Sequence, residues 1–311
     1  MPPVNRNHPK RAASSESQYS LMEFMREFPD DSACLEWLWR NRCSDDGSHA
    51  ECPKCERIRK FHKVADRPAW DCDSCGHHLH PTAGTIFHKS STSLHLWFYA
   101  MHLMTSTRCG ISAKQLEREL GVTYKTAWRI ANLIRNELMA DDGEVLDGPV
   151  EADETYIGGR HRHRGMGGRP GTDSHKTPVF GVVQRGRGRG QVIARVVPDA
   201  TTPTLMGQIT QRVMPASLIY TDEWKPYENL RKAGYSHRRI HHASKVYVSG
   251  DIHTNTIEGF FSLAKNGIRG VYHSVSRKWL QGYLNEYAWR YNRRTSTRSQ
   301  FELLLLRAAR S

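Results

Sequence analysis

Residues 150–159 read VEADETYIGG, and three acids stand in this stretch among residues that favour a β-strand. Val150 and Ile157 are strand-forming types, whereas carboxylates are depleted from strands. The acids are Glu151, Asp153 and Glu154. A strand that carries so many carboxylates either is a solvated edge strand or binds a positively charged group. The rest of the chain decides between these two interpretations.

Acidic residues recur at the ends of other predicted elements in this half of the chain. Asp222 directly follows the apolar strand SLIYT at 217–221, and Glu258 lies on a helix predicted over 254–265. Carboxylates from two strands and a helix suit a pair of hard divalent cations, Mg²⁺ or Mn²⁺. Two such ions can activate a nucleophile and stabilise the leaving oxygen of a phosphodiester. We therefore expect Asp153, Asp222 and Glu258 to form one catalytic, metal-binding site.

Strand and helix patterns are mixed throughout this half. After the opening stretch, strands are predicted at 177–184, 191–197, 217–221 and 239–242, and helices at 202–214, 226–233, 254–265 and 276–292. This order predicts an α/β fold, a mixed sheet with helices packed on it. Alternate side chains of a regular strand point to opposite faces, so Glu154 and Glu223 would lie away from the acids beside them.

Four of the seven cysteines form two closely spaced pairs, CPKC at 52–55 and CDSC at 72–75. The sixteen residues between the pairs match C-x₂-C-x₁₅₋₂₀-C-x₂-C, a pattern typical of zinc sites. Four thiolates, from Cys52, Cys55, Cys72 and Cys75, complete a tetrahedral shell with no open position, so the predicted Zn²⁺ is structural. A redox pair and a chance spacing are the alternatives. The nearby histidines that could replace one thiolate are His49, His62, His77 and His78. The cysteines without a partner at metal spacing are Cys34, Cys43 and Cys109.

Helical patterns flank this predicted zinc ribbon. Residues 21–42 mix apolar and charged side chains at helical spacing, and a break at Pro29 predicts two short helices. Residues 85–87 are expected to complete the last ribbon strand, and residues 93–105 to form a buried helix.

Residues 111–138, ISAKQLERELGVTYKTAWRIANLIRNEL, have the outline of a helix-turn-helix. Apolar residues recur at helical spacing on both sides of Gly121, which permits the turn. The start of the second helix, where such motifs read base edges, carries Tyr124, Lys125, Thr126 and Arg129. Two helices of an ordinary bundle are the alternative, but the preceding ribbon and the basic chain favour DNA.

The chain carries a strong excess of positive charge. Its 45 Lys and Arg residues against 32 Asp and Glu residues give a formal net charge of +13, which favours a polyanionic partner. No apolar run is long enough for a membrane span, and the first twenty residues lack the apolar core of a secretory signal. We expect a cytoplasmic, nucleoid-associated protein that binds no membrane.

Several motifs together resemble the insertion-sequence DDE transposases of the ISXO type. They are VEADETYIGG, YTDEWKPY at 220–227, HTNTIEGFFSLAKNGIRGVYHSVS at 253–276 and YLNEYAWRYNRR at 283–294. The resemblance spans about residues 20–295, with the zinc ribbon and helix-turn-helix included. It implies a ribonuclease-H-like catalytic domain that performs Mg²⁺-dependent strand cleavage and strand transfer on double-stranded DNA, both element ends and target. It also implies a homo-oligomer, since two element ends must be brought together.

Carried over by position, the resemblance assigns Asp153, Asp222 and Glu258 as the acidic triad. Lys265 matches the basic residue expected two helical turns after the glutamate. In parts of the family an asparagine is the third ligand, and Asn255 lies one turn before Glu258. We favour Glu258, because a carboxylate binds Mg²⁺ more strongly than an amide does.

An Arg- and Gly-rich segment after Gly158 is the second predicted DNA contact. Its arginines, which can clamp phosphates without reading sequence, include Arg160, Arg162 and Arg164. The predicted organisation is a flexible N-terminus (1–20), a helical lead-in and zinc ribbon (21–90), a helix-turn-helix region (91–140), a catalytic domain (147–295) and a C-terminal tail (296–311). A nuclease of the same fold that does not join strands, and a non-catalytic zinc-ribbon regulator or inactivated transposase, are the alternative functions.

Overall fold

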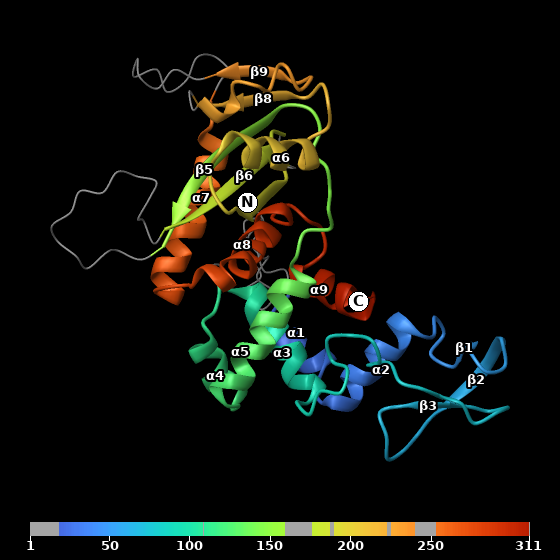
Figure 1. Ribbon diagram of the computed structural model, residues 1–311. Coiled ribbons are helices and arrows are strands. Elements are labelled where there is room, and N and C mark those ends of the chain that lie inside the picture. The colour runs from blue at the N-terminus through green and yellow to red at the C-terminus, as the bar shows by residue number, and fades with distance from the viewer. Residues whose placement is uncertain are drawn as a thin grey trace, which may run out of the picture. The chain divides into compact units, whose positions relative to one another are not determined.

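The computed structural model describes residues 19–107, 109–158, 176–186, 190–222, 225–239 and 253–310 (Figure 1). The chain divides into two compact units. The described part of the first comprises residues up to 107 together with 116–123 and 296–310, and the second is built from 109–115 and from residues between 124 and 295. Each unit has its own core.

Four helices lie wholly within the described part of the first unit: α1 (Leu21–Glu27), α2 (Asp31–Arg42), α3 (Leu94–Ser106) and α9 (Gln300–Arg310). Their starts follow from local sequence. Ser20 and Glu23 make a capping box on α1, and the side chains of Asp30 and Ser93 accept backbone N–H groups at the starts of α2 and α3. The predicted break at Pro29 is confirmed.

Aromatic rings hold these helices together. The ring of Phe301 on α9 lies 5.7 Å from Phe24 and 6.0 Å from Phe28, between ring centroids. Phe28 in turn lies 5.1 Å from Phe98 on α3. The apolar C-terminal segment is therefore a core helix of the first unit.

The zinc-ribbon segment is a four-stranded antiparallel sheet in the order β1-β2-β3-β4. Its strands are β1 (His49–Cys52), β2 (Arg57–Lys63), β3 (Trp70–Cys72) and β4 (His78–Leu79). Trp39 of α2 stacks on Trp70 with ring centroids 4.6 Å apart and planes 4° from parallel. The strand expected at residues 85–87 is wrong: the chain turns there, because the backbone N–H of His88 bonds back to the carbonyl of Thr85.

The helix-turn-helix segment contains α4 (Ala113–Leu120) and α5 (Tyr124–Leu133), as predicted. Gly121 follows α4 with φ +63°, a left-handed conformation that glycine adopts at little energetic cost. A π-helical turn, η1 (Ile134–Leu138), continues α5 directly. The segment contributes to both units, with 116–123 in the first and α5 in the second.

A five-stranded mixed sheet forms the second unit, in the order β7-β6-β5-β8-β9. Its strands are β5 (Val150–Ile157), β6 (Thr177–Gln184), β7 (Val192–Val196), β8 (Leu218–Thr221) and β9 (Ser236–Arg239). The first three are antiparallel neighbours, whereas β8 runs parallel to β5 and β9 runs parallel to β8. This mixed sheet confirms the predicted α/β fold class.

Helices cover both faces of this sheet (Figure 1). On one face α6 (Thr202–Arg212) packs through Leu205 and Ile209 on a cluster that includes Phe180. On the other face lie α7 (Asn255–Gly267), its π-helical continuation η4 (Ile268–Tyr272) and α8 (Arg277–Asn292). The interior strand β6, which pairs with β5 and β7, is consequently buried on both faces.

Two predicted elements of this unit differ from the structure. The helix expected over 226–233 is wrong, because only a 3₁₀ turn, η2 (Lys225–Tyr227), and further turns form there. Tyr227 and Leu230 are both fully buried. With three residues per turn, 3₁₀ geometry points both side chains to the same side, here toward the core. The strand expected at 239–242 begins earlier, at Ser236, and residues 240–242 lie outside the described ranges.

Glycine at position 181 allows α7 to approach the sheet. A Cβ atom there would lie 2.5 Å from the ring of Phe261 and 2.8 Å from the side chain of Ile257, both on α7. Gly181 is the register partner of Asp153 on β5. Because glycine has no side chain, α7 can lie close to the sheet directly beside the acidic strand.

Across the described ranges, no helix has both the length and the apolar character needed to cross a bilayer.

Candidate active site and metal centres

Two neighbouring parallel strands bring the predicted acids together. Glu151 of β5 pairs with Tyr220 of β8, and Asp153 and Asp222 each follow their pairing residue by two positions. The carboxylate groups of Asp153, Glu154 and Asp222 each place an oxygen within 4.8 Å of the other two. All three residues are partly exposed, so the cluster is open to solvent on one side. Such a convergence of oxygen ligands can hold a divalent cation.

Glu154 is the member of this acidic cluster that strand alternation did not predict. Its carboxylate accepts a 2.8 Å hydrogen bond from the hydroxyl of Tyr227, a residue in the core on the α6 face. The alternation itself holds, but β8 ends at Thr221, and its pairing with β5 stops at Glu151. Beyond Glu151, β8 does not cover this edge of β5. The side chain of Glu154, which starts on the α6 face, can therefore reach the carboxylate oxygens of the other two acids around the open edge. Glu223 lies outside the described residues.

Mutual repulsion and burial disfavour the charged state of the acidic cluster. Burial, followed by the charges of Glu154 and Asp222, raises the pKa of Asp153 from 3.8 to about 8. Burial also raises the pKa of Glu154, against the hydrogen bond from Tyr227. Without a cation Asp153 therefore holds a proton near neutral pH, whereas a bound divalent cation would favour the ionised form of its carboxyl group.

The third predicted acid, Glu258, lies on α7 and is exposed. It contributes to the negative field that acts on Asp153, but its oxygens are not among those grouped within 4.8 Å. Thr254, just before α7, donates a 2.7 Å hydrogen bond to Glu258. Asn255 is the exposed first residue of the same helix.

Lys265 lies near the C-terminal end of α7, beside the acidic strand β5. Its Nζ donates a hydrogen bond to the hydroxyl of Thr155, two residues after Asp153 on the same face of β5. Burial, followed by the charge of Arg269, lowers the pKa of Lys265, and the carboxylate of Asp153 opposes this change. A cationic side chain therefore stands near the acidic cluster.

The first acid of the opening stretch, Glu151, anchors helix α7. Its fully buried carboxylate accepts the backbone N–H groups of Thr256 and Ile257, at 2.8 and 3.1 Å, and the hydroxyl of Thr256 at 2.7 Å. The guanidinium of Arg185 donates to the same carboxylate at 2.7 Å. A negative charge from β5 thus caps the start of the helix that carries Glu258. Sequence reasoning missed this role, which local spacing does not reveal.

We expect Glu151→Gln to lower the free energy of unfolding by about 3 kcal/mol, because it leaves the charge of Arg185 without its buried partner. Urea unfolding of the full chain measures this change. The matched control is Glu258→Gln, the same substitution at an exposed position, which should change stability by no more than about 0.5 kcal/mol. Equal effects of the two substitutions would contradict the anchoring role.

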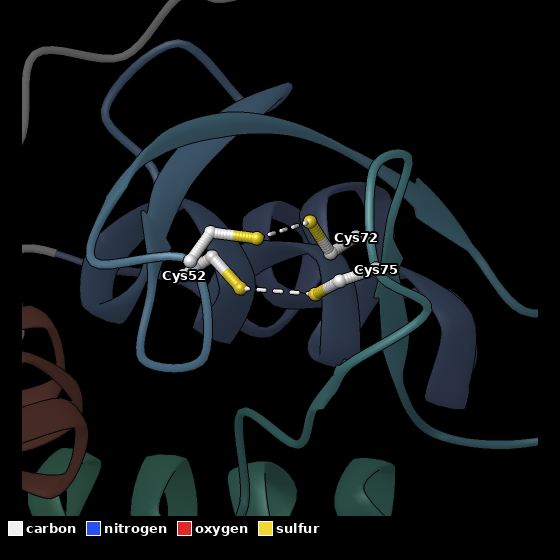
Figure 2. Close-up of side chains that lie close together, drawn as sticks. Cys52, Cys72 and Cys75 are labelled. Carbon is white, nitrogen blue, oxygen red and sulfur yellow. Dashed lines mark hydrogen bonds between the residues drawn. The ribbon is translucent and has the colours of Figure 1, made fainter.

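The four predicted zinc ligands converge in the ribbon. Figure 2 shows the thiols of Cys52, Cys72 and Cys75 pointing toward one another. The sulfur atoms of Cys52 and Cys75 are 3.6 Å apart, and those of Cys55 and Cys72 are 4.0 Å apart. A tetrahedral shell with Zn–S bonds of about 2.3 Å places sulfurs about 3.8 Å from one another. The geometry therefore fits one Zn²⁺ ion, and the separations are too long for disulfides.

Both cysteine pairs lie in equivalent turns. Glu56 and Gly76, each directly after the second cysteine of its pair, have φ values of +52° and +65°. The N–H of Glu56 bonds to the carbonyl of Cys52 at 2.8 Å, and that of Gly76 bonds to Cys72 at 2.9 Å. Among the described residues the group contains cysteines alone, so none of the nearby histidines replaces a thiolate.

The predicted base-reading residues occupy the first turns of α5. Lys125 and Arg129 are exposed, Tyr124 is 45% exposed, and Thr126 is partly buried. The ammonium group of Lys114 lies 5.2 Å from the ring centroid of Tyr124. The predicted DNA contacts Arg160, Arg162 and Arg164 fall outside the described residues.

Comparison with known proteins places these features in a family. Residues 145–292 match the ISXO2-like transposase domain. An uncharacterized protein in the transposable element ISH50 of Halobacterium salinarum is 30% identical over 253 residues, which are 77% of this chain and 84% of that protein. The chain belongs to the ISXO2-like insertion-sequence transposases.

Other relatives agree with this membership. An uncharacterized transposase-like protein of Haemophilus influenzae is 30% identical over 114 residues, 37% of this chain and 90% of that protein. The crystal structure of the Mos1 strand transfer complex matches 64% of this chain and 77% of its own at 10% identity, with a TM-score of 0.22, a similarity too low to bear on the fold. The ISXO2-like domain contains the whole acidic cluster, Glu258 and Lys265, and the cysteine group precedes it.

Proposed function

We propose that this ISXO2-like chain is an active transposase that cleaves DNA at element ends and transfers the freed 3′ ends to target DNA. One observation carries the proposal: Asp153 on β5 and Asp222 directly after β8 stand at equivalent register positions of adjacent parallel strands in the family domain, and their carboxylates converge. A protein that only binds DNA has no need of a carboxylate pair that repels itself in this way.

The acids Asp153, Asp222 and Glu258 would hold Mg²⁺ or Mn²⁺. Such ions activate the attacking hydroxyl and stabilise the leaving oxygen in an in-line displacement. Glu258 is assigned as the third ligand in preference to Asn255, because a carboxylate binds these hard cations more strongly. Glu154, which shares the cluster, keeps the local field negative and orients toward Tyr227.

Cationic side chains on the same face would hold the DNA. Lys265, which donates a hydrogen bond to Thr155 of β5, would contact a phosphate next to the scissile bond. Residues Tyr124, Lys125, Thr126 and Arg129 at the start of α5 would read the terminal repeat in the major groove. The basic segment with Arg160, Arg162 and Arg164 remains a predicted phosphate contact, and a homo-oligomer remains the predicted assembly.

The cysteine group would hold a structural Zn²⁺. Cys52, Cys55, Cys72 and Cys75 supply four soft sulfur ligands at separations that suit a closed tetrahedral shell. Because no coordination position stays open, this ion would order the ribbon and take no part in strand cleavage.

A strand-transfer assay tests the proposed activity. Purified protein is incubated with labelled element-end DNA and a plasmid target, with Mg²⁺ or with EDTA. We expect Mg²⁺-dependent joined products. Cleavage without joining would favour a nuclease of the same fold, and binding without cleavage would favour a non-catalytic DNA-binding protein.

The raised pKa of Asp153 predicts how Mg²⁺ binding depends on pH. In the metal-free folded protein a proton occupies this site below about pH 8, so a cation must displace it. We expect the affinity for Mg²⁺ to increase by up to about tenfold per pH unit as the pH rises toward that value. Without metal, the same shift lowers stability as pH rises from 3.8 to about 8, because the folded state binds the extra proton.

Calorimetric titration of Mg²⁺ between pH 6.5 and 8.5, in buffers of different ionisation enthalpy, measures both affinity and proton release. Asp153→Asn is the control, and its weaker binding should vary less with pH. An affinity that does not depend on pH in the wild-type protein would contradict the raised pKa.

A further inference from the structure

The DNA-reading helix of the proposed function is built into the catalytic unit. Trp128 of α5 packs edge-on against Trp279 of α8, with ring centroids 4.8 Å apart and planes at 79°. Both rings are partly buried. Further along, the side chain of Asn285 on α8 donates a 3.1 Å hydrogen bond to the carbonyl of Arg135 on η1. Helix α8 therefore contacts both α5, through Trp128, and η1, through Arg135.

A buried ion network stands at the end of this helix. Arg135, which is 2% exposed, donates from Nε to the fully buried carboxylate of Glu286 at 2.7 Å. Arg290 bonds to the other oxygen of Glu286 at 2.6 Å. Although burial alone would raise it, the pKa of Glu286 lies below its usual value because both arginines favour the carboxylate. The network is thus charged, and it resists separation because either partner alone would be a buried unpaired charge.

The same arginine reaches the helix of the third acid. Its guanidinium lies 5.2 Å from the ring centroid of Tyr272, and its terminal nitrogen is 3.4 Å from the Tyr272 hydroxyl. That hydroxyl donates to Glu286 at 3.1 Å. Tyr272 ends η4, which continues α7, the helix with Glu258 and Lys265. Two π-helical turns, η1 and η4, therefore meet at Arg135, and such turns are frequent at functional positions.

We propose that Arg135 is a positioning residue that locks α5 to α7 and α8, so that the bases read by α5 determine the phosphodiester presented to the acids. This inference rests on the proposed function, and it adds what determines the position at which the enzyme cuts. DNA rises about 3.4 Å per base pair, so a displacement of α5 by that distance moves the cut by one nucleotide. Side-chain contacts set the distance between α5 and the acidic cluster, and the covalent link through residues 139–146 does not.

Mapping of cut positions on element-end DNA at nucleotide resolution tests this proposal. The wild type should cut at one position. Arg135→Gln and Trp279→Ala should bind the same DNA with an affinity within about threefold of the wild type. They should nevertheless cut at several neighbouring nucleotides, with a yield at the main site at least about tenfold lower. The reason is that a misplacement of the reacting groups by about 1 Å already lowers the rate by up to about 100-fold. Trp279→Phe, which keeps an aromatic contact, should restore the single position.

Insertion of Ser-Gly after Gly143, in an exposed part of the link, is the matched control. It should leave the cut position unchanged. A cut that shifts with this insertion, or single-site cutting that survives both Arg135→Gln and Trp279→Ala, would overturn the proposal.

Hydrogen exchange of the full chain gives a readout that does not depend on activity. The amides of α5 and η1 should be protected as strongly as those of α8, and both sets should lose protection together in Arg135→Gln. Fast, independent exchange of α5 in the wild type would overturn the coupling. If the wild type does not cut DNA, the proposed function fails, and hydrogen exchange still decides the coupling.

Discussion

Asp222→Ala and Asp153→Asn are each expected to abolish Mg²⁺-dependent strand cleavage and strand transfer while element-end DNA stays bound. Each substitution removes a carboxylate that would bind the metal directly. Loss of an outer partner of a metal ligand typically costs about 10- to 100-fold, so loss of a direct ligand should exceed about 100-fold in cleavage rate. DNA binding should change little, because the proposed base-reading contacts lie on α5.

Stability separates this loss of activity from unfolding. The acids repel one another in the metal-free protein, since neighbouring carboxylates raise the pKa of Asp153. Asp153→Asn removes part of this repulsion, so the free energy of unfolding without metal should stay the same or increase. Denaturant unfolding in EDTA measures it beside the gel-based cleavage assay.

The control for the acidic cluster is Glu144→Gln, which removes an exposed carboxylate from the link before the sheet. It should leave cleavage within about twofold of the wild type, as surface substitutions usually do. If Asp222→Ala and Glu144→Gln cleaved DNA equally well, the assignment of the acids as catalytic would be wrong.

Removal of the Zn²⁺ ion proposed for the ribbon is the second change with a large expected effect. We expect one Zn²⁺ per chain in the purified protein, and its loss in Cys72→Ser or on prolonged chelation should unfold the ribbon. Structural zinc contributes about 10–16 kcal/mol of apparent binding free energy in small zinc domains. The buried cluster of the ribbon and α2 is small, with Trp39, Phe61 and Trp70 as its largest members, so few contacts remain to replace the metal.

The stacked pair Trp39 and Trp70 reports on this unfolding. The two rings lie 4.6 Å apart and nearly parallel, and they belong to α2 and β3, so their near-UV circular dichroism should fall when the ribbon separates from the helix. Metal analysis gives the zinc content of the same samples. The wild type should regain the signal when Zn²⁺ is added back.

Cys109→Ser is the matched control for the ribbon. Cys109 is an exposed free cysteine outside the metal-ligand group, so this variant should keep one zinc per chain and an unchanged spectrum. A Cys72→Ser protein that retained full zinc and the wild-type spectrum would show that the four cysteines do not form the predicted centre.

Local spacing in the sequence determined most of the elements, the group of four cysteines, and two of the three acids that converge, Asp153 and Asp222. The CPKC and CDSC pairs predicted a ribbon because two-residue spacing puts two thiols in one turn. Asp153 and Asp222 could be placed together because each stands on or directly after a predicted strand, and the register of β5 and β8 brings them level. Glu258 of α7 was predicted from its place on a helix beside the two acidic strands and again from the family resemblance, and its role as a metal ligand remains a proposal.

Only the tertiary structure decided which acid does what in the opening stretch. Glu151 caps α7 across 105 residues of sequence, and Glu154 joins the acidic cluster because β8 ends early beside it. Arg135 meets Glu286 across 151 residues. Charge, periodicity and capping are read along the chain and fix local conformation. The partner of a buried charge depends on which distant segments pack together, and so it emerges only from the folded chain.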